Sequence, residues 1–434
     1  MSKKKKKIDL GNLEDREALC PHFNNCGGCS FQKVSYEQQL KYKADMVRKL
    51  LAEVYDPFLF EGIIASPVEE HYRNKMEFTF GDEYKDGPAA LGLHQRGSFM
   101  NIVNIRDCHL VHEDINRVRN ATLDFFKKYL DLGEIRFYNN KQHMGWLRHL
   151  LIRRAEKTGE ILAALVTTSD MDSGCTAESD LQENDLLAAY TELIKSLKLE
   201  GKMAGIIHII NDGLADTVRA DRIDILSGRD FIYEEVLGLK FKISVFSFFQ
   251  TNTLGAELLY DKAREYTGLW PEKNGSDLRE VQNASQKGCG CRLLFDLYSG
   301  TGTIAQLMAP SSEKIIGVEI VEEAVEAARA NAALNGIDNV EFIAEDVLKA
   351  ADTLGIPDAL ILDPPREGIN PRALGKILSW NVDKIVYVSC KPESLARDLR
   401  SFKLAGYELE KACCVDMFPQ TGHVECVVLM EKYR

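Results

Sequence analysis

Two reactive side chains follow strand-like segments near the end of the 434-residue chain. Asp363 comes directly after the apolar run DALIL and before two prolines, and Cys390 comes after KIVYVS. Because open α/β sheets bind ligands at the carboxyl ends of their strands, both side chains are expected to converge on one crevice. A thiol there can act as a nucleophile if part of it is thiolate, which Lys391 and the start of a following helix would favour. The alternative for an isolated cysteine is a small apolar residue that fills a strand end.

A possible proton acceptor lies in the later segment DMFPQTGHVE, which ends at Glu425. If the last residues of this segment are extended, His423 and Glu425 project to the same side because strand side chains alternate. His423 could then orient Glu425 or set its charge. The alternative interpretation is a surface hairpin with a solvated glutamate.

A glycine turn, YSGTGT, follows the strand-like RLLFDL and starts at Tyr298. Glycines let the backbone turn tightly and approach a ligand. Glu319 ends the next strand-like segment about 20 residues later, where a carboxylate can accept hydrogen bonds from two ribose hydroxyls. The pair predicts a cofactor that contains a nucleoside. GTGTIA also satisfies G-x-G-x-x-A, so a dinucleotide oxidoreductase is an alternative on this pattern alone.

A cysteine cluster lies near the N-terminus, where Cys20, Cys26 and Cys29 have the spacing C-x5-C-x2-C. Three thiolates within ten residues indicate a metal, and spacing alone allows either zinc or an iron-sulfur cluster. A chance cluster is the alternative, and a fourth ligand must come from elsewhere. The eleven cysteines are an odd number with no secretory signal before them, which argues against a disulfide framework.

Strands and helices alternate from about residue 243 onward, which predicts a mostly parallel, doubly wound α/β sheet that ends in an antiparallel hairpin. We predict three parts: a basic tail over 1–19, an α+β domain with the cysteine cluster and the candidate nucleic-acid-binding surface over 20–244, and an α/β cofactor-binding domain over 245–434. The lysine run 3–7 is more typical of a solubilising tail than of a specific contact. The polar segments 169–185 and 271–288 are expected to be loops.

The net charge of −12 means that any nucleic-acid contact must use local basic residues. Candidates for phosphate contact are Arg73, Lys75, Arg148, Arg153 and Arg154. The alternative, favoured for each residue taken singly, is a solvated charge. No apolar segment is long enough to span a membrane, and the start MSKKKKKIDL lacks a signal-peptide core. The sequence therefore predicts a cytoplasmic protein, and no obligatory protein partner is evident.

Three ordered motifs, LDPPREG, IVYVSCKPES and VDMFPQTGHVE, resemble the closing motifs of the RNA (uracil-5-)-methyltransferase family. YRNKMEF, FSFFQTN and the cysteine cluster extend the resemblance to nearly the whole chain. It implies a Rossmann-like class I methyltransferase domain with S-adenosylmethionine as cofactor. Cys390 then matches the nucleophile that adds to C6 of the base, and Glu425 matches the base. The implied cofactor-binding residues are Gln250, Tyr298, Glu319, Asp346 and Asp363.

The resemblance also implies a [4Fe-4S] cluster in the N-terminal domain, with Cys108 of IRDCHLV as the fourth ligand. Lys391 and Ser394 stand where the family commonly has Asn and Thr, which puts helix capping there in doubt. The cluster motif favours 23S ribosomal RNA as substrate, and transfer RNA is the alternative. Many ribosomal members begin with a TRAM domain, for which the residues before Cys20 are too few. A non-catalytic iron-sulfur RNA-binding or assembly protein is the alternative of another class.

Overall fold

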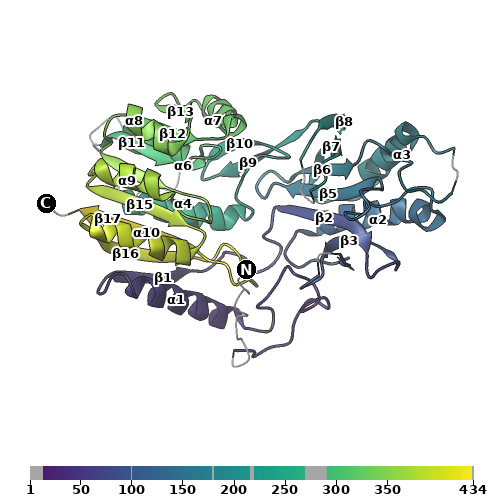
Figure 1. The fold of residues 1–434 in the computed structure, drawn as a ribbon, viewed down its shortest axis with the longest axis horizontal. Helices are drawn as coiled ribbons and strands as arrows, with labels where there is room; N and C mark the ends of the chain where they lie inside the picture. Colours follow the sequence, from purple (N-terminus) through teal and green to yellow (C-terminus); the bar gives the residue numbers. More distant parts are fainter. Residues whose placement is uncertain (1–12, 99, 178–179, 216–218, 269–290, 433–434) are drawn as a thin grey trace.

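The computed structural model describes residues 13–98, 100–177, 180–215, 219–268 and 291–432. Within these ranges the chain forms an eight-stranded sheet, a seven-stranded sheet and a two-stranded hairpin. Figure 1 shows the two large sheets as two lobes, with the C-terminal part of the chain in one lobe and the central part in the other. The lysine run 3–7 and the polar segment 271–288 lie outside the described residues.

The eight-stranded sheet has the order β1, β16, β17, β15, β14, β11, β12, β13. Strands β11 to β15 are parallel, and β17 is antiparallel to both β15 and β16, which confirms the predicted doubly wound sheet and closing hairpin. The bounds are β1 (Leu59–Ile64), β11 (Cys291–Leu297), β12 (Ser312–Glu319), β13 (Val340–Ala344), β14 (Ala359–Leu362), β15 (Lys384–Ser389), β16 (Tyr407–Val415) and β17 (Glu425–Lys432).

Helices cover both faces of this sheet, and each face has its own buried core. One face of the sheet packs against α4, α6, α7 and the separate two-stranded hairpin. The other face packs against α1, α8, α9 and α10. Their bounds are α1 (Tyr36–Ala52), α4 (Thr253–Thr267), α6 (Thr303–Met308), the 3-10 turn η1 (Ala309–Ser311), α7 (Glu322–Leu334), α8 (Val347–Thr353), α9 (Pro371–Ser379) and α10 (Pro392–Leu404).

The seven-stranded sheet has the order β4, β3, β2, β5, β6, β7, β8 and is mostly antiparallel. Two helices, α2 and α3, pack on one face, while the other face shares a hydrophobic cluster with the hairpin and α4. The bounds are β2 (Lys75–Asp82), β3 (Ala89–His94), β4 (Ile102–Asn104), α2 (Glu113–Leu132), β5 (Leu147–Arg154), β6 (Glu160–Thr167), α3 (Glu183–Ser196), β7 (Lys202–Ile210), β8 (Arg222–Gly228), β9 (Phe231–Val236) and β10 (Leu239–Ser244).

An N-terminal strand and helix lie with the C-terminal sheet. β1 pairs in parallel with β16 at the sheet edge, and α1 packs beside α10, as Figure 1 also shows. Both elements fall inside the predicted range 20–244. The eight-stranded sheet therefore includes one strand, β1, from before the predicted domain boundary at residue 244. The division of the chain into two domains at that residue stays a prediction.

Candidate active site and cysteine cluster

Cys390 and Glu425 leave neighbouring strands on the same face of the eight-stranded sheet. Alternate residues of β15 and β17 pack in the core beneath α4 and α7, and Cys390 and Glu425 fall in that alternation. The strands pair with Ser389 opposite Cys426, so the next antiparallel position sets Cys390 opposite Glu425. Opposite residues in such a ladder have Cβ atoms about 5 Å apart. Two strands therefore bring a thiol and a carboxyl into direct reach.

Two carboxyl groups, Glu425 and Asp363, oppose the ionisation of the Cys390 thiol, and Asp363 also opposes that of Glu425. Burial, Glu425 and Asp363 raise the pKa of Cys390 to about 11. Burial and then Asp363 raise the pKa of Glu425 to about 8, and burial raises the pKa of Asp363 to about 7. Each charged form is disfavoured because little water and few cations surround the group. The site would therefore hold a cationic ligand more readily than an anionic one.

Arg366 opposes this crowding, and the sequence analysis missed it. Its positive charge lowers the pKa values of both Cys390 and Glu425. Its Nη2 atom lies 3.3 Å from Nδ1 of His423, so His423 contacts this arginine. Lys391, the expected cation, is instead the residue before α10 and makes no side-chain cap. The sequence did offer a signal, because Arg366 lies in the LDPPREG motif itself.

Tyr260 is the second residue that the sequence analysis missed. It lies on α4, is 7% exposed, and is hydrogen-bonded to the side chain of Gln250. Burial, followed by Asp363 and Glu425, holds the pKa of this phenol well above its usual range. Nothing in the spacing of α4 distinguishes Tyr260 from an ordinary core residue. Gln250 is also held through its backbone, because its carbonyl accepts a hydrogen bond from Asn74 Nδ2 at 2.9 Å.

The glycine turn brings Tyr298 and Glu319 to the same edge of the sheet. Tyr298 has a φ of +67°, a backbone conformation that costs a non-glycine residue free energy and is common at ligand sites. Glu319 Oε2 accepts a hydrogen bond from Gly300 N at 3.0 Å, and its Oε1 accepts from the two residues after it. A Cβ built on Gly300 would meet nothing within 4 Å, so the turn faces open space.

Two buried polar atoms at this turn have no hydrogen-bond partner among the described residues. They are Oδ1 of the fully buried Asp296 and Oγ of Ser299. Asp346 caps α8 by accepting from Leu348 N at 2.8 Å, and its charge helps to raise the pKa of Tyr298 after burial. Orphaned acceptors, carboxylates and an open turn fit a ligand with hydroxyl groups and positive charge, as S-adenosylmethionine has.

The four cysteines predicted as metal ligands lie together. Burial and then the thiols of Cys108, Cys26 and Cys20 raise the pKa of Cys29 to about 12. None of the four forms a disulfide. Gly28 N donates to Cys26 Sγ at 3.3 Å and Gln32 Nε2 to Cys29 Sγ at 3.5 Å, the type of bond that stabilises metal-bound sulfur. Because the thiols oppose one another's ionisation, a bound cation would offset the cost of four thiolates.

The prediction that Arg148 and Arg153 contact phosphate is wrong. Each is 2% exposed. Arg148 donates to the backbone carbonyls of Asn211, Gly213 and Ala215, and Arg153 to that of Val245. β5 is buried on both of its faces, so a basic run on a central strand is a poor sign of a surface. Arg154 is mostly buried on Asp114, whereas Arg73 and Lys75 stay half-buried candidates.

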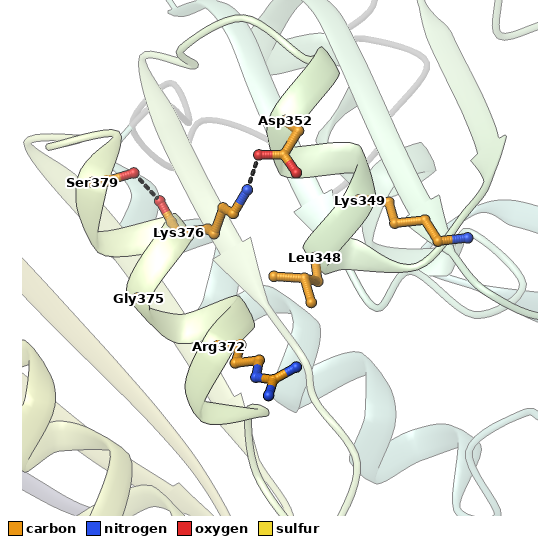
Figure 2. A pocket seen from close by; sticks show the side chains of 7 residues that line it. All are labelled: Leu348, Lys349, Asp352, Arg372, Gly375, Lys376 and Ser379. Atoms are coloured by element: carbon orange, nitrogen blue, oxygen red, sulfur yellow. Dashed lines mark hydrogen bonds and ion pairs between the residues drawn. The ribbon is translucent and has the colours of Figure 1, made fainter.

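Two surface hollows lie away from these strand ends. One lies between α8 and α9, and Figure 2 shows Lys376 turned to Asp352 across it. The other, of about 1250 Å³, lies beside β2, β3 and the loop after α2. A third group, made of Glu70, His71 and His109, has possible metal-binding atoms within 4.8 Å of one another. None of these includes Cys390 or Glu425.

Comparisons with known proteins agree with this fold. Residues 290–379 match a family described as Methyltransferase domain, and residues 356–433 match tRNA (Uracil-5-)-methyltransferase. The tRNA (uracil-54, C5)-methyltransferase of Pyrococcus abyssi, solved with S-adenosyl-L-homocysteine, has a TM-score of 0.68 and 26% identity, over 93% of this chain and 86% of that one. The eight-stranded sheet is accordingly the fold of class I S-adenosylmethionine-dependent methyltransferases.

Sequence relatives extend over nearly the whole chain. An uncharacterized RNA methyltransferase of Clostridium acetobutylicum is 46% identical over 95% of this chain and 83% of its own length. Another, of Caldanaerobacter subterraneus subsp. tengcongensis, is 45% identical over 96% of this chain and 85% of its own. The chain belongs to the RNA (uracil-5-)-methyltransferase family, and it is an enzyme of that class. In the described residues no helix is long and apolar enough to cross a membrane.

Proposed function

We propose that this chain methylates C5 of a uridine in RNA through a covalent adduct between Cys390 and C6 of the base. The observation that carries the proposal is that Cys390 and Glu425 come directly next to the paired residues Ser389 and Cys426, and that Glu425 acts on the charge of Cys390. The cofactor would be held by Gln250, Tyr298, Glu319, Asp346 and Asp363. The target base must leave its stack to reach these groups.

The two reactive side chains have complementary tasks. The Cys390 thiolate forms a bond to C6, and the electrons of the C5–C6 double bond move toward the C4 carbonyl as an enolate. S-adenosylmethionine, when bound, supplies an electrophilic methyl group to C5. Glu425 then accepts the proton from C5, the C5–C6 double bond forms again, and the bond from C6 to sulfur breaks. The thiolate returns to its starting state.

Substitution of the two residues separates these tasks. We expect Cys390→Ala to abolish methyl transfer, because no carbon nucleophile forms. Glu425→Gln keeps the addition step but slows elimination, so a covalent protein-RNA adduct accumulates on denaturing gels. Cys175→Ala, which removes a thiol distant in sequence from these motifs, serves as the control. Methyl transfer by Cys390→Ala at the wild-type rate would contradict the covalent mechanism. Cofactor binding without methylation of any cellular RNA would favour the non-catalytic alternative.

The proposed substrate is 23S ribosomal RNA, because the cysteine motif resembles that of the ribosomal members. Transfer RNA is the second candidate, since the similar solved enzyme from Pyrococcus abyssi is a tRNA methyltransferase. Mapping 5-methyluridine in ribosomal and transfer RNA from cells with and without this protein distinguishes the two. A site lost from transfer RNA alone would exclude the first candidate. Cytoplasmic location stays a prediction.

We further propose that Cys20, Cys26, Cys29 and Cys108 hold a [4Fe-4S] cluster. In support, the four thiols lie close enough for Cys108, Cys26 and Cys20 to raise the pKa of Cys29, after burial, to about 12. Gly28 N donates to Cys26 Sγ and Gln32 Nε2 to Cys29 Sγ, and hydrogen bonds to the sulfurs are one of the ways in which a protein tunes such a cluster.

The iron content tests this assignment. After anaerobic purification we expect about four iron atoms and four sulfides per chain. Cys108→Ser should lose iron, and Cys175→Ser should keep it. A colourless, zinc-loaded, folded protein would contradict the cluster.

A further inference from the structure

The loop before the proposed base is held by the N-terminal part of the chain. This loop, residues 416–423, connects β16 to the strand that starts at Glu425, and we call it the base loop. Its residue Gln420 is 1% exposed and has a φ of +66°. Such a backbone costs a glutamine free energy and persists only where the surroundings fix it.

The backbone of Gln420 is fixed from the cysteine segment, which we define as residues 20–32. Its carbonyl accepts hydrogen bonds from Ser30 N at 2.9 Å and from Phe31 N at 3.0 Å, directly after Cys29. Its own N–H donates to Gln39 Oε1 at 2.9 Å. Three backbone or side-chain groups that lie nearly 400 residues earlier in the sequence thus define one strained residue.

The side chain of Gln420 is also held. Its Oε1 accepts from Gln39 Nε2 at 3.0 Å and from Arg16 Nη2 at 2.9 Å. Gln39 is fully buried and its Nε2 also donates to the carbonyls of Phe31 and Val34. Gln39 therefore links the start of α1, the cysteine segment and the base loop in one set of hydrogen bonds.

The cysteines enter this network through Gln32, which is 2% exposed. Gln32 Nε2 donates to Cys29 Sγ, its Oε1 accepts from Cys20 N at 2.9 Å, and its carbonyl accepts from Arg16 Nε at 2.8 Å. Arg16 then donates to Gln420. The geometry of the thiols and that of the base loop are thus connected by two short routes, through Gln32 and through the backbone after Cys29.

Two further contacts make the base loop stiff. The ammonium group of Lys43 on α1 lies 2.7 Å from Asp416 Oδ1, with both side chains fully buried, and it also donates to the carbonyl of Phe418. Tyr72 OH donates to the carbonyl of Pro419 at 2.9 Å. At the other end of the loop, His423 contacts Arg366, whose charge acts on both Cys390 and Glu425.

We infer that Gln39 and Gln420 are positioning residues through which the cysteine segment sets the place of Glu425 against the reacting base. They act by fixing the base loop at Gln420, five residues before the strand begins at Glu425. The inference rests on the proposed reaction. A small displacement of Glu425 slows proton removal and leaves addition by Cys390 intact.

The test is the fate of the covalent adduct in Gln39→Ala. We expect turnover to fall roughly 100-fold or less, as for a base misplaced by about 1 Å. The fraction of enzyme trapped as protein-RNA adduct should rise, while the KM for S-adenosylmethionine and the iron content stay near wild type. Gln38→Ala, from the adjacent position on α1 where the side chain donates to Asp15 Oδ2 at 3.3 Å on the surface, is the matched control.

Gln420→Asn is the second variant, because asparagine tolerates a positive φ and keeps the backbone hydrogen bonds while its shorter amide cannot reach Arg16 and Gln39. It should also accumulate adduct, even if Gln39→Ala does not fold. Adduct levels equal to those of Gln38→Ala in both variants overturn the inference. Slower turnover without adduct would also overturn it, since the base would then not be the group displaced. Methylation by Cys390→Ala, measured in parallel, marks failure of the reaction itself instead.

Discussion

At the scale of single residues, the proposed site contains more acids than cations. Glu425 and Asp363 raise the pKa of Cys390, Asp363 also raises that of Glu425, and the charge of Arg366 opposes both shifts. A crowded set of acids is costly without a ligand, and a cofactor that carries a sulfonium and an ammonium group would reduce that cost. The raised pKa values of these acids are therefore consistent with a site that binds a cationic ligand.

The pKa of Glu425 makes both stability and elimination depend on pH. Its pKa rises from an ordinary 4.5 to about 8 in the folded chain, so the folded state binds this proton more tightly than the unfolded state does. The resulting stabilisation is present below about pH 4.5 and is lost as the pH rises to about 8. Glu425→Gln has no such loss. We expect the wild type to weaken relative to this variant by on the order of 3 kcal/mol between pH 5 and pH 8.5.

Denaturant midpoints of the two proteins at several pH values measure this difference. Glu408→Gln, at an exposed position of β16, should track the wild type throughout. Release of the adduct needs Glu425 unprotonated, so single-turnover release should speed up as the pH approaches 8 and then level off. A flat difference in stability across this range would show that Glu425 ionises normally.

At the scale of elements, the sequence predicts the parallel strands well, because apolar runs and glycine turns are local signals. Each predicted run from RLLFDLY to KIVYVS is a strand, and the closing hairpin is present. The sequence also locates Asp363, Cys390 and Glu425 at strand ends. It cannot supply the β15–β17 register, which depends on pairing between segments distant along the chain. That register is what sets Cys390 opposite Glu425.

The residues that the sequence analysis missed or assigned wrongly are those whose positions depend on packing between distant segments. Tyr260 reaches the site from a helix with an ordinary core pattern, so only packing reveals it. Arg148 and Arg153 have the sequence pattern of surface cations. Their burial and their hydrogen bonds to backbone carbonyls become evident only in the folded chain. The strand β1 has a weak alternation and pairs with a segment about 350 residues later, so its sheet could not be inferred from neighbouring residues.

At the scale of the whole molecule, the N-terminal segment is part of the methyltransferase sheet as well as of the cysteine cluster. α1 and β1 cover α10 and the open edge of β16. Val47 and Leu51 of α1 are fully buried there. An uncovered strand edge is a template for pairing with other chains. The two ends of the sequence therefore stabilise each other.

This mutual support predicts that the C-terminal part does not fold alone. A chain of residues 229–434 keeps the hairpin but loses α1 and β1. It gives up about 1.5–3 kcal/mol for each buried Val or Leu, and it leaves Asp416 without Lys43, which costs about 3–5 kcal/mol for a buried ion pair. These losses approach the 5–15 kcal/mol that stabilise a typical domain.

For the chain of residues 229–434 we expect aggregation and no calorimetric binding of S-adenosylmethionine. The same chain with residues 36–64 joined by a flexible linker should be monomeric and bind the cofactor. A monomeric 229–434 chain with full cofactor affinity would show that the N-terminal segment serves the cysteine cluster and the base loop alone.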